Sequence, residues 1–406
     1  MTIEGWVLPK QESSWAPPGT CTILAVGLTW REAIFAIVFG STVMAVPMTA
    51  NGWTGARTRA PFPVLARASF GYHFAKFPVV IRLVTCLFWH AITNFLAIGP
   101  ATQVIRSIWP SYQNLPNHIP ESVGITPQQM ASYFVIWCVQ FPIMMIPPHK
   151  MRWLFVVKVF ATTATILGTS TVRVNISDFT RYMAKPSWVA IVGIVVTSAS
   201  GVLYGKLLWD PISIIDKWEG PGGRAAAFLA GVSWCIAQIC INISPTVISG
   251  ANDMASLFPK FIKIRRGAII LTILGGWVMV PWKILNSAGS LLSFMSSLGI
   301  FLAPIMGIQI ADYYIVKRGH TDIPALYQPH GRYQYTYGIN WRAPVALVLS
   351  ATPQLPGLIN AVNPSISKLI IEYKLVLRVC LFTICVTMGR KMHSMHDQGS
   401  LCPSKV

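Results

Sequence analysis

Long apolar stretches alternate with short basic clusters along the whole chain. Ten of these stretches can cross a bilayer as helices, because about 20 apolar residues span its hydrocarbon core. They lie at about 33–52, 77–104, 130–147, 153–174, 188–204, 225–249, 268–285, 291–310, 343–362 and 369–388. The last stretch is the weakest, since Glu372, Lys374 and Arg378 interrupt its first turns. The pattern predicts an all-α polytopic membrane protein.

The composition agrees with this prediction. Of 406 residues, 53% are hydrophobic and 11% are charged, with a mean hydropathy of +0.54. A soluble protein has about a quarter of its residues charged. The net charge of +19 comes from Lys and Arg clusters between apolar runs. This is the positive-inside pattern of membrane proteins, so we expect a lipid bilayer and not a nucleic acid as partner.

The basic clusters conflict with the predicted topology at one place. Most clusters are separated by two spans, so all of them can face the cytoplasm. Between Arg152 and Arg181, however, residues 153–180 provide 28 positions, whereas two spans and a turn need roughly 40. We therefore expect that 153–180 is not a normal pair of crossings.

A row of polar residues lies inside the apolar run that begins near Ala225. Asn242, Ser244, Thr246 and Ser249 follow one another closely, with Pro245 between them. Asn242 and Thr246 are four residues apart and share one helical face. Inside a bilayer such groups face protein, water or a ligand. Helix–helix packing explains any one of them, and a ligand-facing surface is an equal alternative for the row.

Catalytic, metal and cofactor motifs are missing from the sequence. The 13 acidic residues include no pair in the middle of a span and no HExxH-like motif, and there is no GxSxG or Walker A loop. The eight cysteines form no CxxC pair, so neither a zinc site nor a disulfide framework is indicated. We predict that the protein is not an enzyme and has no cofactor or metal.

Seven motifs together resemble the nucleobase–cation symporter family 1, and in particular its fungal-type uracil, uridine and allantoin permeases. They are PFPVLARASFG (61–71), NISDFTRY (175–182), LYGKLLWDP (203–211), SGANDMASLFPKFIKIRRG (249–267), PWKILNSAGSLLSFM (281–295), DYYIVKR (312–318) and YQYTYGINWRA (333–343). The resemblance extends from about Leu28 to Met388.

The resemblance implies a leucine-transporter-like fold with an inverted five-helix repeat. Family members have twelve helices, against about ten spans here, and bind substrate at mid-membrane between the first, third, sixth and eighth helices. The implied organisation is an N-terminal tail at 1–20, a single transporter domain at 21–388 and a cytoplasmic tail at 389–406. The implied function is import of uracil, uridine or allantoin with a cation, expected to be a proton, by alternating access at the plasma membrane.

The resemblance also implies four substrate-binding residues. Trp89 matches a tryptophan of the third helix that stacks on a planar ring, and Thr93 stands where the family has a glutamine. On the eighth helix Asn242 matches a family asparagine, and Thr246 replaces a second one. A hydroxyl does not offer the paired donor and acceptor of an amide. Ordinary packing is the alternative for Trp89 taken alone, and only its matched context favours stacking on a ligand.

Coupling and gating residues follow from the same resemblance. Lys158 matches a fifth-helix lysine of the proton-coupled members, and snorkelling to the cytoplasmic face is an equal alternative. Leu292 and Met295 match a helix that the family uses as a substrate gate. His90 could titrate, but we interpret it as a structural histidine.

Parts of the family pattern are expected to be missing. The first helix remains only as 21–28, while 151–160 resembles the start of the fifth helix and 171–182 the end of the sixth. The alternative function is therefore a truncated, non-transporting product, or a binding-only nutrient sensor of the same family.

Overall fold

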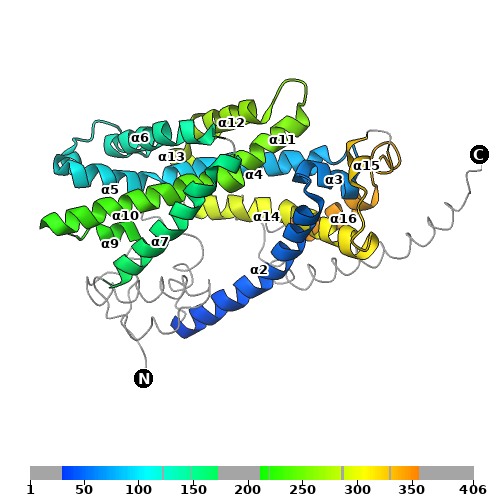
Figure 1. The fold of residues 1–406 in the computed structure, drawn as a ribbon, viewed down its shortest axis with the longest axis horizontal. Coiled ribbons are helices and arrows are strands. Elements are labelled where there is room, and N and C mark those ends of the chain that lie inside the picture. Colours follow the sequence, from blue (N-terminus) through cyan, green and yellow to red (C-terminus); the bar gives the residue numbers. More distant parts are fainter. Residues whose placement is uncertain are drawn as a thin grey trace, which may run out of the picture.

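A computed structural model describes residues 30–120, 123–146, 148–171, 211–218, 220–284, 288–328 and 331–355. These ranges contain helices and no strand, apart from one isolated bridge between Thr336 and Ile339 (Figure 1). The α-helices are α2 (Trp30–Thr58), α3 (Phe62–Phe70), α4 (Lys76–Leu96), α5 (Ile98–Ile108), α6 (Pro127–Met144), α7 (Arg152–Thr171), α9 (Pro211–Ile215), α10 (Gly220–Ile241), α11 (Ser249–Leu257), α12 (Ile264–Ile273), α13 (Pro281–Ile284), α14 (Ala288–Ala311), α15 (Ile323–Tyr327) and α16 (Arg342–Ala351).

Shorter segments connect or interrupt these helices. Pro110–Asn114, Pro148–Met151 and Thr352–Gln354 are 3-10 turns. Three π-helical segments continue the α-helices before them: η6 (Asn242–Ile248), η7 (Leu274–Val278) and η8 (Asp312–Val316). π-helical turns are rare and frequently occur at functional sites.

Three helices within the described ranges have the length and hydropathy of a membrane span: Lys76–Ile108, Gly220–Leu257 and Gly299–Val316. They include the helices predicted at 77–104 and 225–249 and most of the one at 291–310. The helices predicted at 33–52 and 130–147 lie in α2 and α6, and the stretch at 153–174 is helical through Thr171 in α7. The stretches at 188–204 and 369–388 lie outside the described residues.

The helix predicted at 268–285 is wrong as one continuous element. It ends with η7, and Val280 has a left-handed φ of 48° before α13 begins at Pro281. Proline has no N–H and disfavours the helical conformation of the residue before it. Pro281 therefore explains why the helix breaks there.

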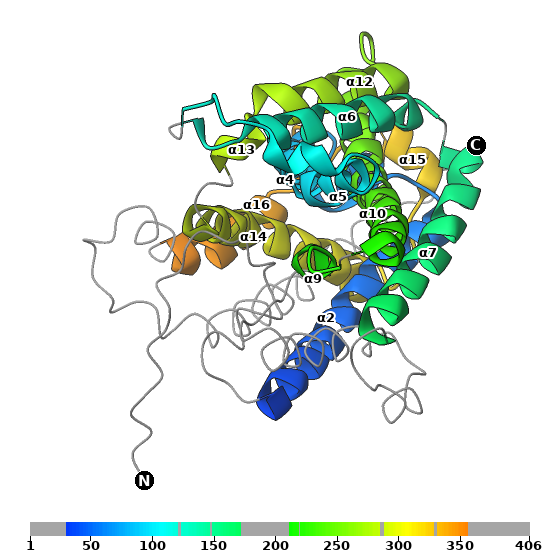
Figure 2. The same cartoon turned by 90° about the vertical axis from the view of Figure 1, so that its left-hand side faces the viewer.

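Two long helical rods form the centre of the molecule. Rod α4–α5 lies against rod α10–η6–α11, with α5 on α10 and α4 on α11 (Figure 1). Helices α6 and α12 cover one side of the two rods, and α14 packs against α4 on the other, as the end-on view shows (Figure 2).

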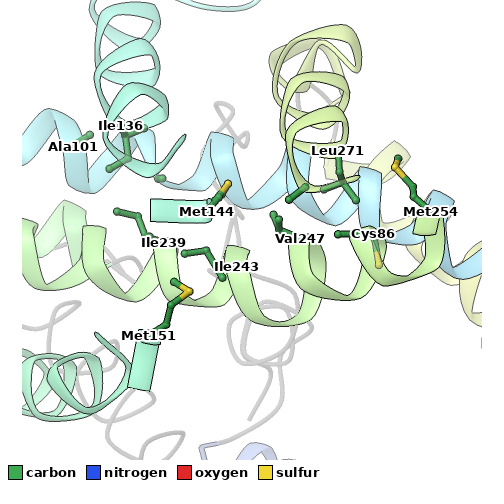
Figure 3. Close-up of a cluster of buried hydrophobic side chains, with 13 residues drawn as sticks. Cys86, Ala101, Ile136, Met144, Met151, Ile239, Ile243, Val247, Met254 and Leu271 are labelled. Atoms are coloured by element: carbon green, nitrogen blue, oxygen red, sulfur yellow. The ribbon is translucent and has the colours of Figure 1, made fainter. Parts of the chain in front are cut away.

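The largest of several clusters of buried apolar side chains in the described residues lies between these helices (Figure 3). Cys86 comes from α4, Met144 from α6, Val247 from η6 and Leu271 from α12. Leu271 and its neighbours are almost fully buried, so the cluster fixes how the rods pack.

Two of the basic clusters meet at one end of the molecule, near α3 and α15 (Figure 1). Arg67 donates to the carbonyl of Leu326 at 3.1 Å, and Lys317 donates to the carbonyl of Ala68 at 2.7 Å. The clusters at 57–76 and 317–342 therefore lie on the same side, as predicted. Because basic clusters favour the cytoplasmic side of membrane proteins, we expect this side to face the cytoplasm and refer to it as the cytoplasmic end.

Candidate functional site

The site is built around the π-helical segment η6. Pro245 has no N–H, so the α-helical hydrogen-bond pattern cannot continue through it. The backbone widens into a π-helix from Asn242 to Ile248. Asn242 and Thr246 are both buried in this segment, with 1% and 4% of their surfaces exposed.

Asn242 is the centre of a buried network of side-chain amides. Its Nδ2 donates to Asn94 Oδ1 on α4 at 2.6 Å, and to Gln140 Oε1 on α6 at 3.4 Å. Gln140 Nε2 donates to the same oxygen of Asn94. Three separate helical elements are joined by these bonds.

The side-chain oxygen of Asn242, Oδ1, also has hydrogen-bond partners within the protein. His90 Nδ1 lies 2.7 Å from Asn242 Oδ1, and the Thr246 hydroxyl, which is 2.9 Å from this oxygen, also contacts the backbone carbonyl of Asn242. Because an amide oxygen only accepts, His90 carries a proton on Nδ1. The amide of Asn242 is therefore saturated by protein groups. Any ligand that binds it displaces one of them, and the 3.4 Å contact with Gln140 is the longest.

Glycines in η7 let α12 approach the network closely. A Cβ atom on Gly275 would lie 2.7 Å from His90 Cδ2, and one on Gly276 would lie 2.8 Å from Trp137 Nε1. Tyr133 donates its hydroxyl hydrogen to the carbonyl of Gly276. Only residues without a side chain fit here.

Some buried polar atoms of the network have no hydrogen-bond partner in the described part of the chain. They are His90 Nε2, Asn94 Nδ2 and Trp137 Nε1. All three belong to residues packed around Gly275 and Gly276.

The four predicted substrate-binding residues lie on two elements that touch. Trp89 and Thr93 are on α4, Asn242 and Thr246 are on η6, and α4 packs against η6. Trp89 is 38% exposed and directly precedes His90. Thr93 is buried and donates its hydroxyl to the Trp89 carbonyl at 2.7 Å. The hydroxyl hydrogen of Thr93 is thus used within the helix.

Lys158 lies on α7, which packs against α10. It lies one turn after Leu154, whose carbonyl oxygen is 3.8 Å from the thiol of Cys240, and Cys240 is two residues before Asn242. Leu292 and Met295 are in the first turns of α14, where the side chains are outside the described part. The motif at 175–182 and the short stretch at 21–28 also lie outside the described residues.

Two groups of residues were not predicted as part of a site. Gln140 is a lone amide in the apolar run at 130–147, a signal that could have identified it. Arg82 and Asp253 form an ion pair that joins α4 to α11. Within the described ranges, no three His, Cys, Asp or Glu side chains gather as metal ligands do.

Comparison with known proteins decides the family. Residues 15–165 and 159–376 match the family described as permease for cytosine/purines, uracil, thiamine, allantoin. An uncharacterized permease of Schizosaccharomyces pombe is 33% identical over 400 residues, which cover 85% of this chain and 71% of the relative. The chain belongs to this permease family. It is therefore a membrane transporter of the nucleobase–cation symporter type and not an enzyme.

Other relatives extend the same picture. The uracil permease of Saccharomyces cerevisiae is 28% identical, over 84% of this chain and 64% of its own length. The allantoin permease of Bacillus subtilis is 27% identical, over 83% of this chain and 79% of its own length.

The permease fold is that of Mhp1. Its inward-facing structure has a TM-score of 0.56 and 18% identity, with 93% of this chain and 89% of that chain covered. Its closed structure with bromovinylhydantoin has a TM-score of 0.57 and 20% identity, with 88% of this chain and 86% of that chain covered. The fold class predicted from the sequence, a leucine-transporter-like repeat, is confirmed by this likeness.

The alignment with the S. pombe permease includes positions that this chain lacks. The alignment is 400 positions long, but it includes only 85% of the 406 residues of this chain, which is fewer than 400. The relative thus has residues inside the aligned region without a counterpart here. The family match also divides into two stretches that overlap at 159–165, within α7. This is where missing helix segments are predicted from the sequence.

Proposed function

We propose that this permease imports a planar ring that carries amide groups, such as uracil, uridine or allantoin, together with a proton across the plasma membrane. Relatives that bear the names uracil permease and allantoin permease support the substrate class. A hydantoin, a ring of the same chemistry, is bound in the closed Mhp1 structure. Transport occurs by alternating access, in which two sets of helices move about a fixed site.

The observation that supports this proposal is the buried amide of Asn242 on η6, which packs against α4, the helix that carries the half-exposed Trp89. The Trp89 indole offers a flat face, and an aromatic pair adds about 0.5–1.5 kcal/mol beyond the area that it buries. A carbonyl oxygen on the ligand's ring accepts the Nδ2 hydrogen of Asn242 that now reaches Gln140 at 3.4 Å. Thr93 and Thr246 complete the site with hydroxyl oxygens that accept from ring N–H groups.

Coupling and gating belong to the neighbouring helices in this proposal. Lys158 holds the proton near the start of η6, because it lies one turn after Leu154, whose carbonyl oxygen is 3.8 Å from the thiol of Cys240. Leu292 and Met295 close the site from α14, which packs against α4.

Uptake of radiolabelled uracil, uridine and allantoin in a permease-deficient host tests the proposal, with and without a protonophore. Trp89→Ala is expected to reduce uptake at low substrate about two- to tenfold, as the loss of stacking requires. Trp89→Phe is expected to keep most of it. Trp109→Ala, at the exposed residue that follows α5, is the matched control. Uptake that is unchanged in Trp89→Ala removes the stacking role.

The internal gap favours a second candidate function. A permease that lacks segments between the fifth and sixth helices can bind a ligand without moving it, as a non-transporting product or a sensor. Ligand binding by the purified chain without uptake in cells supports this candidate. A plasma-membrane rim of a C-terminal fluorescent tag, together with normal uptake, contradicts it. Transcript reads across the codons for 160–172 show whether a longer form exists.

A further inference from the structure

Exposed apolar and cationic residues alternate along the sequence of the corner between α11 and α12, residues 258–266, and we call them its apolar row and its cationic row. The apolar row has a residue at every third position: Phe258, Phe261 and Ile264, which are 54%, 73% and 52% exposed. The cationic row has the same spacing: Lys260, Lys263 and Arg266, joined by Arg265, all exposed. The corner projects from the bundle at the cytoplasmic end (Figure 1).

The backbone of the 258–266 corner is well anchored. Ile262 packs against the central apolar cluster. The N–H of Ile262 donates to the Phe258 carbonyl at 2.9 Å, and the N–H of Gly267 donates to the Lys263 carbonyl at 2.9 Å. The two exposed rows are therefore presented in a fixed arrangement and are not the side chains of a loose loop.

Three other cations of the cytoplasmic end are engaged by the protein itself, whereas Arg57 and Arg59 are exposed. Arg67 donates to the Leu326 carbonyl, Arg82 pairs with Asp253, and Lys317 pairs with Asp312. In the 258–266 corner, Arg266 donates only to the Phe261 carbonyl.

The remaining three cations of the corner are different. Lys260, Lys263 and Arg265 make no hydrogen bond or ion pair with any residue of the ranges described above. The sequence contains no acidic residue from Met254 to Ala311 that could neutralise them. Their charge is thus available to an anion outside the protein.

The position of the corner selects the anion. It joins the ends of a membrane-spanning rod, Gly220–Leu257, and the helix α12, so it lies at the boundary between bilayer and cytoplasm. Aromatic rings are favoured at the headgroup level, and anionic lipids attract Lys and Arg there. We propose that the 258–266 corner binds the headgroups of anionic phospholipids in the cytoplasmic leaflet. The apolar row enters the acyl region, and the cationic row meets the phosphate and carboxylate groups.

Lipid retention by the full chain tests this inference. The protein is reconstituted in vesicles of phosphatidylcholine with a minor fraction of phosphatidylserine, extracted in mild detergent, and the retained lipids are quantified by mass spectrometry. We expect the unaltered chain to retain phosphatidylserine in excess of its share. The double variant Lys260→Gln with Lys263→Gln is expected to lose at least about fivefold of that enrichment, since each cation near an anionic surface contributes about this factor.

The matched control is Arg57→Gln with Arg59→Gln, which removes two exposed charges at the same end of the molecule. It is expected to retain phosphatidylserine as the unaltered chain does. Because a variant can fail to fold, the unaltered chain is also washed at high salt, which should abolish the enrichment. Equal loss in both double variants, no enrichment in the unaltered chain, or enrichment that resists salt overturns the proposal. None of these outcomes depends on transport activity.

Discussion

Asn242 Nδ2 and Asn94 Oδ1 are 2.6 Å apart, and this hydrogen bond joins η6 to α4 in the centre of the bundle. The orientation of the Asn242 amide is fixed by the groups around it. A flipped amide would direct its oxygen at Asn94 Oδ1, which already accepts from Gln140 Nε2, so that two acceptors would face each other. Because the amide is buried in the bundle, no water molecule can replace a hydrogen-bond partner that it loses. The network therefore determines which polar groups the site can offer.

Removing this amide should destabilise the protein. Asn242→Ala leaves His90 Nδ1–H and the Gln140 oxygen without a partner, and each orphaned buried group costs about 1–3 kcal/mol. We expect a lower thermal unfolding midpoint in detergent. Unfolding is monitored by intrinsic fluorescence. Ser244→Ala changes an exposed residue of the same π-helical segment and should shift stability by less than about 0.5 kcal/mol. Equal midpoints for the two variants would contradict the network.

The close approach at η7 gives a second prediction. In Gly275→Ala the new Cβ atom would meet His90 Cδ2 at 2.7 Å and the Leu87 carbonyl oxygen at 3.1 Å. His90 has no free space in which to move, because it is fully buried. Overpacking of this kind costs about 1–3 kcal/mol. We expect reduced thermal stability and weaker ligand binding.

Gly222→Ala is the control for this substitution. It adds the same methyl group near the start of α10, where no heavy atom lies within 4 Å. Alanine is a better helix former than glycine, so the stability of this variant should be equal or higher. A loss of stability in the control as large as that in Gly275→Ala would refute the steric argument.

Much of the helical framework could be predicted from apolar run length, as the rods at 77–104 and 225–249 show. Their internal breaks were harder to predict. Pro100 and Pro245 are visible in the sequence, but whether a proline produces a kink or a π-helical turn depends on the packing around it. The break before Pro281 was missed because apolar residues continue across it.

The site shows a similar limit. The resemblance identifies Asn242, but not the residues that hold it. Gln140 is 102 positions away in the chain, so only the packing of α6 against the rods brings the two amides together. His90 was interpreted as structural from its sequence, and its contact with Asn242 depends on Gly275 in a third helix. Contacts between distant segments follow from tertiary packing and not from local pattern.

The ion pair between α4 and α11 leads to a third prediction. Arg82 Nε donates to Asp253 Oδ2 at 2.7 Å, and the guanidinium lies 3.9 Å above the ring of Phe62. Asp253 is fully buried, while the Arg82 side chain is 23% exposed. Removing one partner of a buried pair costs about 3–5 kcal/mol, and solvent near Arg82 reduces this cost.

A double-mutant cycle measures the coupling of this pair. Arg82→Gln and Asp253→Asn should each destabilise the protein by up to about 3 kcal/mol. The double variant should cost less than the two singles together, because two neutral amides can hydrogen-bond each other and no charge remains buried. The read-out is the thermal unfolding midpoint of the three variants. Strictly additive losses would show that the contact contributes no interaction energy.

The cytoplasmic end contains a tyrosine that should make stability depend on alkaline pH. Tyr335 donates its hydroxyl to the Ala68 carbonyl at 2.7 Å, and Lys317 donates to the same oxygen. Although 38% of Tyr335 is exposed, its hydroxyl lies against α3. Burial, and next the negative charge of Asp312, raise the pKa of Tyr335 above the ordinary value of 10.0.

A raised tyrosine pKa means that the folded protein keeps a proton that the unfolded chain releases above about pH 10. The hydroxyl's contribution to stability is therefore constant below that pH and decreases as the pH rises further. Tyr335→Phe lacks this titrating hydroxyl. Lys317 and Tyr333 are present in both proteins, so their effects on stability cancel when the two proteins are compared. The stability advantage of the unaltered chain over Tyr335→Phe should thus shrink between pH 10 and 11, measured as unfolding midpoints in detergent. Tyr337→Phe, at a residue that is 90% exposed, should show no such trend. Parallel curves for the unaltered chain and Tyr335→Phe would mean that this hydroxyl is not the titrating group.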